Sequence, residues 1–400
     1  MVSHLASERE DETVTANPLP ENEAAPALVP EAVIADLRGR LRSYRRVPLP
    51  AGHGWERGTE GDYLESLLTY WLDSYDWKEH ENRIRGLPWA LTQTDSGAVR
   101  AIHQRSADPE AIPVLLLHGW PDSVLRFERL LPLLNDVHVV VPALPGFPFA
   151  APIPQGGLSA VAIADTDKEA MSRLGYEKFV ISAGDVGCDV AEAMAGRYPE
   201  AVLSLHLTDV SQYHFLVDLP AVLSPVEETY VRHGRDWQAR EGGYMHEQST
   251  KPHTLAVALG DSPAGLAAWL VEKLRSWTDS NGDVESVFPR DDLLTWITAY
   301  WVTEAIGTSF TPYAEAADKS TTPVAPVVFT IFPKDLVNAP QEFARRHFTV
   351  ASWHEMPAGA HFAAWEYPQD YAQGVHDAVR IAALDENREV AHSSNARGVG

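Results

Sequence analysis

The sequence predicts an α/β protein in which a mostly parallel central sheet is capped by a helical insertion. From residue 112 onward, short apolar runs typical of buried strands alternate with helical patterns, and this order favours parallel strands joined by helices. The strand patterns disappear between residues 212 and 323 and return at Pro326. The third observation is the segment 178–190, where a buried strand, small residues, Asp185 and a helical pattern follow one another.

Composition excludes several classes of partner. The 400 residues include 32 basic and 56 acidic side chains, and this balance disfavours binding to nucleic acid or an anionic membrane. Cys188 is the only cysteine, so no intramolecular disulfide can form and a reducing compartment is compatible. The first 30 residues lack the apolar core of a signal peptide, and no apolar run is long enough to cross a bilayer. We therefore expect a soluble cytoplasmic protein.

An acidic tail and helices are expected before the sheet. Residues 1–30 are rich in Glu, Pro and Ala, so we expect a disordered tail. Residues 31–42 and 63–75 each place apolar side chains at helical spacing, which predicts two amphipathic helices. They belong to an N-terminal region, residues 31–105, whose tryptophans we interpret mainly as packing residues.

The core is expected in two halves on either side of the insertion. The first half, residues 106–211, contains predicted strands at 112–117, 137–141, 179–182 and 203–207. The insertion, residues 212–323, contains helical patterns such as 264–277 and 291–306. The second half, residues 324–385, contains predicted strands at 326–332 and near 348–353 and a helix at 371–384. The polar residues 386–400 are expected to form a flexible tail.

The turn after the third predicted strand places Asp185 at its tip. Gly184 and Gly187 lie close by, as required where a strained turn brings backbone segments together. A side chain at this tip projects above the sheet, and a carboxylate there can attack an sp3 carbon to form an ester on the protein. The alternative is that Asp185 only caps the next helix, since Asp and Gly are common in ordinary turns.

Hydrolysis of such an ester requires hydrogen-bond donors for the oxyanion. The sequence His-Gly-Trp-Pro, residues 118–121, follows the first predicted strand, and its glycine allows a sharp turn. We expect the backbone N–H groups of Trp120 and Val186 to form an oxyanion hole, where each donor is typically worth about 2.7–4 kcal/mol. The alternative for this turn is an ordinary loop.

A base is expected near the C-terminus, because nucleophile, acid and histidine follow one another in a sheet of this kind. His361 follows the last strand pattern and lies among small residues, which distinguishes it among the 16 histidines. Asp335 follows the preceding strand and is the favoured acid partner. Asp209, just past the fourth predicted strand, is the alternative.

Opening a strained ether also requires a proton donor for the leaving oxygen. A tyrosine phenol is neutral at pH 7 and suits this role. The insertion contains Tyr244 and Tyr313, but the pattern alone does not single them out among 13 tyrosines, most of which are expected to pack.

Taken in order, these segments resemble the microsomal-type epoxide hydrolases, a family with the α/β-hydrolase fold. The resemblance extends from Val33 to Leu384, and the joint order of its motifs is highly specific. The motifs are Trp77-Lys78-Glu79-His80 with Asn82, His118-Gly119-Trp120-Pro121, Ala183-Gly184-Asp185-Val186-Gly187, Gly243-Tyr244-Met245, Ser249-Thr250-Lys251-Pro252, Asp261-Ser262-Pro263, Phe332-Pro333-Lys334-Asp335 and Gly359-Ala360-His361-Phe362-Ala363-Ala364.

The resemblance implies an epoxide hydrolase that converts an epoxide and water to a vicinal diol. Asp185 matches the nucleophile, His361 the base that activates water, and Asp335 the acid that orients the base. The expected intermediate is an alkyl ester on Asp185. Epoxide and water are the expected small-molecule partners, and no metal or organic cofactor is implied.

Further positions follow from the same resemblance. Trp120 and Val186 match the backbone oxyanion donors, and Tyr244 and Tyr313 match the two ring-opening tyrosines. Val186 departs from the aromatic residue that the family often has there. Some members carry an N-terminal membrane anchor; we expect none here, and a homo-oligomer is possible.

Two other functions remain open from the sequence. A haloalkane dehalogenase would also use an aspartate at the turn, but it needs halide donors, often an indole next to the nucleophile, which Val186 cannot supply. A protein without catalytic activity that binds a small apolar ligand under the cap is the second alternative. A serine esterase is disfavoured, because no Gly-x-Ser-x-Gly turn occurs at the expected place.

Overall fold

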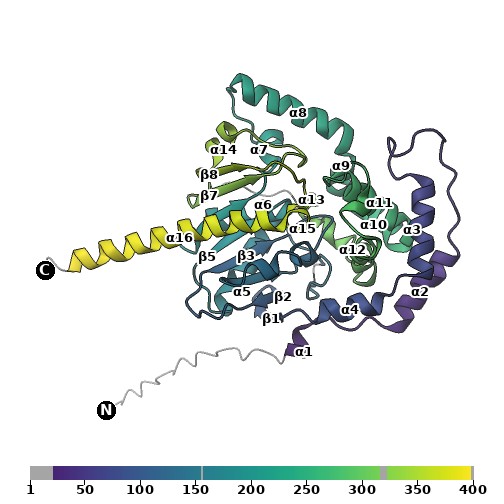
Figure 1. Ribbon diagram of the computed structural model, residues 1–400, viewed down its shortest axis with the longest axis horizontal. Coiled ribbons are helices and arrows are strands. Elements are labelled where there is room, and N and C mark those ends of the chain that lie inside the picture. The colour runs from purple at the N-terminus through teal and green to yellow at the C-terminus, as the bar shows by residue number, and fades with distance from the viewer. Residues whose placement is uncertain (1–20, 155, 316–321, 398–400) are drawn as a thin grey trace, which may run out of the picture.

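An eight-stranded sheet forms the centre of the molecule (Figure 1). The computed structural model describes residues 21–154, 156–315 and 322–397. The strand order is β1-β2-β4-β3-β5-β6-β7-β8. The strands are β1 Trp89–Thr94, β2 Gly97–Gln104, β3 Pro113–Leu117, β4 His138–Pro142, β5 Phe179–Ala183, β6 Val202–Leu207, β7 Pro326–Ile331 and β8 Thr349–Glu355. Strands β3 to β8 pair in parallel, which confirms the predicted mostly parallel sheet.

Helices cover the sheet between successive strands. Helix α5 (Ala160–Arg173) packs against α6 (Val186–Arg197), and α16 (Pro368–Arg397) packs along β6 and β7. The contact with α16 is close, because a Cβ added to Gly374 would lie 2.3 Å from Nε2 of His206. The 3-10 turns η1 (Val124–Phe127) and η2 (Leu131–Leu133) join β3 to β4. Helix α14 (Gln341–His347) contacts β8, and the short helix α15 (Ala363–Glu366) contacts α16 and η1.

In the described residues between β6 and β7, every regular element is a helix. The sequence predicts a helical cap in this region. They are α7 Tyr213–Leu216, α8 Pro225–Glu241, α9 Gly243–Thr250, α10 Pro252–Asp261, α11 Pro263–Ser276, η3 Val284–Ser286, α12 Arg290–Val302, η4 Thr308–Phe310 and α13 Thr311–Ala314. Figure 1 shows α9 to α13 gathered beside one end of the sheet. The carboxyl ends of β3 and β5 lie at this end of the sheet, because Trp120, which follows β3, stacks on Tyr244 of α9 and its N–H donates to Asp185, which follows β5.

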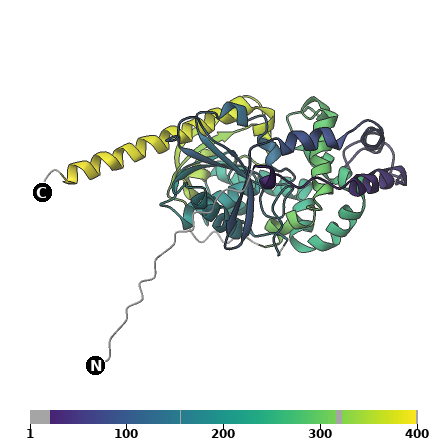
Figure 2. The ribbon, with the colours of Figure 1, turned by 90° about the horizontal axis from the view of Figure 1, so that it is seen from below.

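Helices α2 to α4 pack on the cap, whereas α1 (Glu21–Ala24) contacts strand β1 of the sheet. Helices α2 (Glu31–Arg42) and α3 (Gly61–Asp73) both contact α11, and α4 (Trp77–Arg85) contacts α12. Leu67 and Trp71 of α3 are fully buried or nearly so. Seen from below, these purple helices lie at the opposite end of the molecule from the projecting yellow end of α16 (Figure 2).

The structure differs from the sequence-based expectations in three places. The predicted disordered tail is wrong for residues 21–30, because α1 (Glu21–Ala24) is helical and Ala24 and Ala25 pack in the core; residues 1–20 lie outside the described residues. The antiparallel hairpin β1–β2, within the expected N-terminal region, was not predicted. The predicted flexible tail from residue 386 is instead helical as far as Arg397, the last described residue.

Within the described ranges, no single helix is both long and apolar enough to cross a bilayer. Together, α10 and α11 have the length and apolar composition of a membrane-spanning segment, but the two helices are bent by 115° relative to each other.

Candidate active site

Asp185 lies on a strained turn between β5 and α6. Its φ of 57° and ψ of −134° are rare for a residue with a side chain, and strain of this kind concentrates at functional sites. The turn is possible because Gly184 and Gly187 have no side chains. A Cβ added to Gly187 would lie 2.5 Å from the carbonyl oxygen of Leu117, and one added to Gly184 would lie 2.8 Å from Oγ1 of Thr208.

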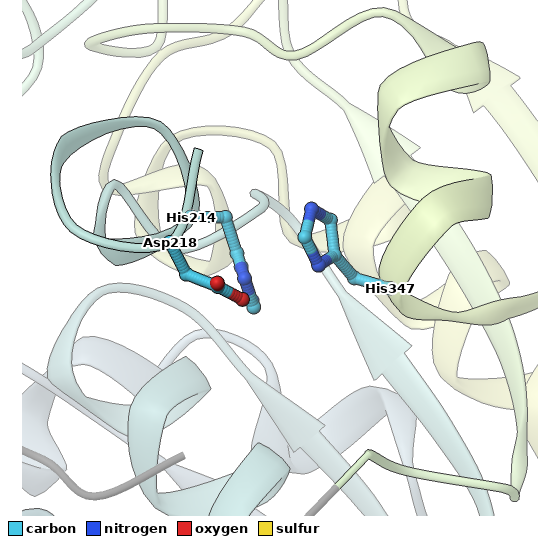
Figure 3. Close-up of side chains that lie close together, drawn as sticks. All are labelled: His214, Asp218 and His347. Atoms are coloured by element: carbon cyan, nitrogen blue, oxygen red, sulfur yellow. The ribbon is translucent and has the colours of Figure 1, made fainter. Parts of the chain in front are cut away.

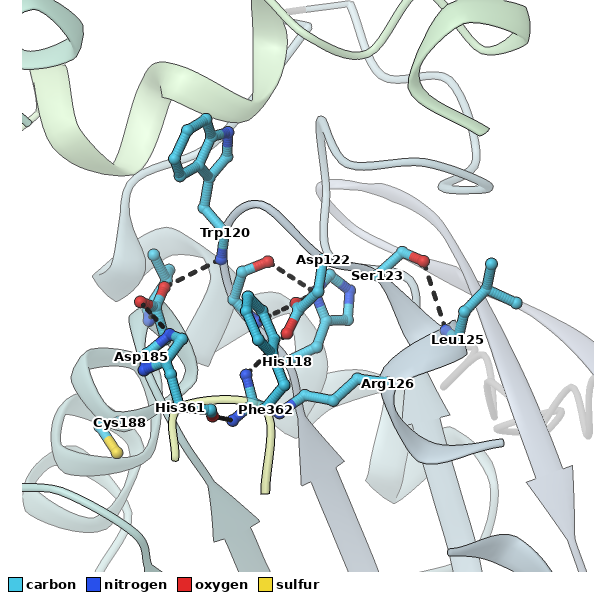
Figure 4. A network of polar contacts seen from close by, with 12 residues as sticks. His118, Trp120, Asp122, Ser123, Leu125, Arg126, Asp185, Cys188, His361 and Phe362 are labelled. Atoms are coloured by element: carbon cyan, nitrogen blue, oxygen red, sulfur yellow. Dashed lines mark hydrogen bonds and ion pairs between the residues drawn. The ribbon is translucent and has the colours of Figure 1, made fainter. Parts of the chain in front are cut away.

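Two backbone N–H groups point at one carboxylate oxygen of Asp185, and Figure 4 shows the contact with Trp120. Oδ1 of Asp185 accepts from the N–H of Trp120 over 2.9 Å and from the N–H of Val186 over 2.7 Å. A Cβ added to Gly119 would lie 2.3 Å from the same oxygen, so only glycine permits this approach. The two donors expected from the sequence therefore converge on the site, and their role as an oxyanion hole remains a prediction.

His361 lies between two carboxylates. Its Nε2 is 3.1 Å from Oδ2 of Asp185, and its Nδ1 is 2.8 Å from Oδ1 of Asp335. The three side chains are 9% exposed or less. Burial opposes the charged imidazolium, but the two carboxylates outweigh this effect and raise the pKa of His361 to about 10. With Asp185 ionised, the imidazole therefore carries a proton at neutral pH.

The structure separates the two candidate acids. Asp335 contacts His361, and although burial would raise the pKa of the Asp335 carboxyl, the imidazolium holds it below its usual value. Asp209 instead accepts hydrogen bonds from the N–H of Asp185 over 3.3 Å and from Sγ of Cys188 over 3.0 Å. Burial and the nearby charge of Asp335 raise the pKa of Asp209 to about 7. The geometry thus favours Asp335 as the partner of the base.

The cap brings Tyr244 and Tyr313 together above this group. Tyr244 on α9 stacks on Trp120, with ring centroids 5.4 Å apart at 7°, and Tyr313 on α13 lies 6.1 Å from Tyr244. Burial, and after it the charge of Asp185, raises the pKa of both phenols well above the usual value. Both are therefore neutral hydrogen-bond donors at pH 7.

Sequence reasoning missed three residues at the site. Trp277 contacts Trp120, Tyr244 and His361 through its ring, and its carbonyl accepts from the N–H of His361 over 3.1 Å. The buried pair Asp122 and Arg126 lies beneath the site. Its i,i+4 spacing directly after Pro121 is a signal that could have indicated it, whereas Trp277 has no local signal.

One group in the described part of the chain offers three potential metal ligands: His214, Asp218 and His347 (Figure 3). The two imidazole rings stack with centroids 3.9 Å apart at 31°. Ring nitrogens bind a metal along the plane of the ring, and two rings stacked this closely at so shallow an angle cannot both hold one ion in their planes. We assign no metal to this group.

An open groove lies elsewhere on the surface. It has a volume of about 890 Å³ and is lined by residues of the segment 44–64 and of α11, including Arg46, Leu49 and Trp269. None of the site residues described above lines it. The groove is thus separate from the chemistry at Asp185.

A carboxylate in the nucleophile position, an imidazole with a second carboxylate, and two backbone donors above a parallel sheet define an α/β-hydrolase whose nucleophile position is acidic. Residues 112–244 match the family model described as the alpha/beta hydrolase fold, and residues 23–127 match the model described as the epoxide hydrolase N terminus. These matches confirm the predicted fold.

Comparison with known proteins gives the family. The chain is 31% identical over 390 residues to epoxide hydrolase 1 of Oryctolagus cuniculus, covering 86% of this chain and 85% of that protein. The structure of juvenile hormone epoxide hydrolase from Bombyx mori superposes with a TM-score of 0.81 at 26% identity, covering 92% of this chain and 95% of that one. The Aspergillus niger epoxide hydrolase gives 0.80 at 25%, covering 91% and 96%. The chain belongs to the epoxide hydrolase family, as predicted.

Proposed function

We propose that this epoxide hydrolase converts an epoxide and water to a vicinal diol in two covalent steps through an alkyl ester on Asp185. The proposal rests on one observation, the contacts of the Asp185 carboxylate. One of its oxygens faces two backbone N–H donors, and the other faces the imidazole of His361. Such an arrangement can hold a carboxylate for attack and then stabilise the oxyanion formed from its own ester.

In the first step, a carboxylate oxygen of Asp185 attacks an epoxide carbon and the C–O bond of the ring breaks. Tyr244 and Tyr313 donate hydrogen bonds to the leaving oxygen, and one phenol supplies the proton that makes it a hydroxyl. Their raised pKa values support this role, since both phenols keep their protons at neutral pH. The aromatic neighbours Trp120, Trp277 and Phe310 favour a substrate with an apolar substituent.

Esterification prepares the second step by removing a charge. An ester at Asp185 carries no negative charge, so one of the two carboxylates that raise the pKa of His361 is lost. The imidazolium can then return its proton to the phenolate left by ring opening, and the neutral imidazole, held by Asp335, takes a proton from water. The hydroxide attacks the ester carbonyl, and the oxyanion rests on the N–H groups of Trp120 and Val186. The tetrahedral intermediate then breaks its bond to the alkyl oxygen, the departing alkoxide takes the proton of the new carboxyl group, and the diol leaves.

The alternatives fit less well. Relatives along most of the chain are named as epoxide hydrolases, which favours this chemistry over dehalogenation. The complete constellation of Asp185, His361 and Asp335 disfavours a protein that only binds its ligand. The expected cytoplasmic location and a homo-oligomer remain predictions, as do the roles of the individual residues.

A single turnover in heavy-oxygen water tests the proposal. The label should enter the carboxyl group of Asp185 before it appears in diol, because water attacks the ester carbonyl and not the epoxide carbon. Mass spectrometry of the peptide around Asp185 and of the diol measures both. Label that appears in the diol within the first turnover would show direct attack by water and refute the ester.

His361→Ala isolates the intermediate. Without the base, Asp185 should still be alkylated, but the ester should persist because its hydrolysis lacks activated water. Intact-protein mass spectrometry after mixing with a terminal epoxide measures the adduct, and Asp185→Asn is the control that should form none. Absence of an adduct in His361→Ala would exclude the two-step scheme.

A further inference from the structure

The ion pair of Asp122 and Arg126 lies beneath the candidate active site and takes part in neither chemical step. Both side chains are completely buried, and Nη1 of Arg126 donates to Oδ2 of Asp122 over 2.6 Å. Both residues belong to the turn around Ser123 and η1. A buried ion pair is a poor source of stability, because both charges lose their hydration. Its presence below the site therefore points to another role.

Asp122 holds the loop that carries the first oxyanion donor. The N–H of Gly119 donates to Oδ1 of Asp122 over 2.8 Å, and the next N–H, that of Trp120, donates to Asp185. The backbone carbonyl of Asp122 accepts from the hydroxyl of Tyr300 on α12 over 3.0 Å. Asp122 thus fixes the peptide before the donor and links this loop to the cap.

Arg126 reaches the other two loops of the site (Figure 4). Its Nη2 donates to the backbone carbonyl of His361 over 2.6 Å. The same nitrogen lies against the nucleophile turn, since a Cβ added to Gly184 would be 2.9 Å from it. One planar guanidinium therefore contacts the main chain of the base and the residue before Asp185, while Asp122 fixes its other end.

We propose that Asp122 and Arg126 are positioning residues that hold the oxyanion loop and the His361 loop in place for hydrolysis of the ester. This role rests on the two-step function proposed above. Formation of the ester depends on Asp185 and the cap tyrosines. Hydrolysis depends on the Trp120 N–H and on His361, which are the two groups whose backbone this pair fixes. Loss of the pair should therefore slow the second step more than the first.

Steady-state kinetics separate the two steps. When hydrolysis becomes slower than alkylation, kcat and KM fall by the same factor, and kcat/KM, which reports ester formation, stays the same. For Arg126→Met and Asp122→Asn we expect hydrolysis to slow by about 10- to 100-fold, as for a small misplacement of catalytic groups. The alkyl-enzyme should then accumulate at steady state, as measured by rapid quench and intact-protein mass spectrometry.

Arg126→Lys tests whether geometry or charge matters. Lysine keeps the charge but cannot donate to Asp122 and to the His361 carbonyl through one planar fork. We expect it to accumulate alkyl-enzyme as well, to a smaller extent than Arg126→Met. If Arg126→Met fails to fold, as judged by circular dichroism, Arg126→Lys and Asp122→Asn carry the test.

A matched control separates positioning from loss of stability. Glu192→Gln removes the carboxylate from another buried contact, that of Glu192 with Nε2 of His214 over 2.8 Å. It should lower the melting temperature without accumulation of alkyl-enzyme. If the Arg126 and Asp122 variants lower kcat/KM as much as kcat, or accumulate no adduct while His361→Ala does, the positioning role is wrong. If His361→Ala itself forms no adduct, the two-step function fails first.

Discussion

Asp185 and His361 each depend on the charge of the other. Nε2 of His361 lies 3.1 Å from Asp185 and Nδ1 lies 2.8 Å from Asp335, so each ring nitrogen faces one carboxylate. When Asp185 becomes an ester, His361 loses one of these neighbours and its pKa falls. In the proposed second step the neutral imidazole can then accept a proton from water.

The stability of the protein should report this raised pKa. His361 has a pKa of about 10 in the fold against an ordinary value of 6.5, so its contribution to stability is complete below pH 6.5 and is lost as the pH rises toward 10. The free energy of unfolding of the wild type relative to His361→Gln should fall across this window, by at most about 1.4 kcal/mol per pH unit. Urea denaturation at several pH values measures it. A difference that grows with pH would contradict the ion pairs.

The two candidate acids should differ sharply when they are neutralised. Asp335→Asn removes the charge that orients His361, and we expect kcat to fall by roughly 10³–10⁴-fold, as in other triads. Asp209→Asn should change kcat by no more than about threefold, because Asp209 binds the N–H of Asp185 and Cys188 rather than the imidazole. Steady-state turnover of one epoxide measures both. Equal losses would show that Asp209 also serves the base.

Sequence reasoning predicted four candidate site residues that follow strands, and the structure brings them together. Trp120, Asp185 and Asp335 come within four residues of the end of a buried strand, whereas His361 follows the last strand after a short loop. A parallel sheet brings such positions to one edge. Tyr244 and Tyr313 were reached only through the resemblance, since helices of the cap carry no comparable local signal. The spacing of Asp122 and Arg126 could have indicated their ion pair, but the contacts of Arg126 and Trp277 with His361 could not be predicted, because they join segments far apart in the chain.

At the scale of elements, local patterns predicted the long helices and the buried strands, but not the short helix α1 or the hairpin at the edge of the sheet. The helix α2, Glu31–Arg42, was predicted at both ends because its apolar residues follow a helical spacing. The hairpin β1–β2 was missed, since its strands carry charged and polar residues on one face and resemble the loops around them. The helix α1 was missed because four residues are too few for a periodic pattern.

The packing of α3 on the cap should be important for stability. Leu67 of α3 is completely buried, so Leu67→Ala leaves a cavity, and we expect a loss of about 2–5 kcal/mol in the free energy of unfolding. Urea denaturation followed by tryptophan fluorescence measures it. Leu28→Ala, at a position that is 60% exposed, is the control and should cost less than about 0.5 kcal/mol. Similar losses in both variants would mean that α3 does not pack on α11 as described.

At the scale of the whole molecule, the chemistry is divided between two layers. The loops of the sheet supply Asp185, Asp335 and His361, whereas the cap supplies Tyr244 and Tyr313. The ring of Trp120 joins them, because it stacks on Tyr244 while its backbone N–H donates to Asp185. In the proposed mechanism, ring opening therefore requires both layers, but hydrolysis of the ester requires only the layer of the sheet.

This division predicts that cap variants and sheet variants slow different steps. In a His361→Ala background, where the ester persists, Tyr244→Phe should slow adduct formation by about 10- to 100-fold, because one donor to the leaving oxygen is lost. The same substitution with His361 intact should leave hydrolysis of a formed ester within about threefold of the wild type. Single-turnover experiments followed by rapid quench measure both rates.

Tyr230→Phe is the matched control for this experiment. Tyr230 is also a buried tyrosine of the cap, but it packs on Phe215 and Phe343 rather than over Asp185. Loss of the Tyr230 hydroxyl should leave both rates unchanged. An effect of Tyr244→Phe can then not be attributed to a general loosening of the cap. If Tyr244→Phe slows hydrolysis as much as ring opening, the cap must also act on the ester, because a phenol that serves only the leaving oxygen has no bond to offer in the second step.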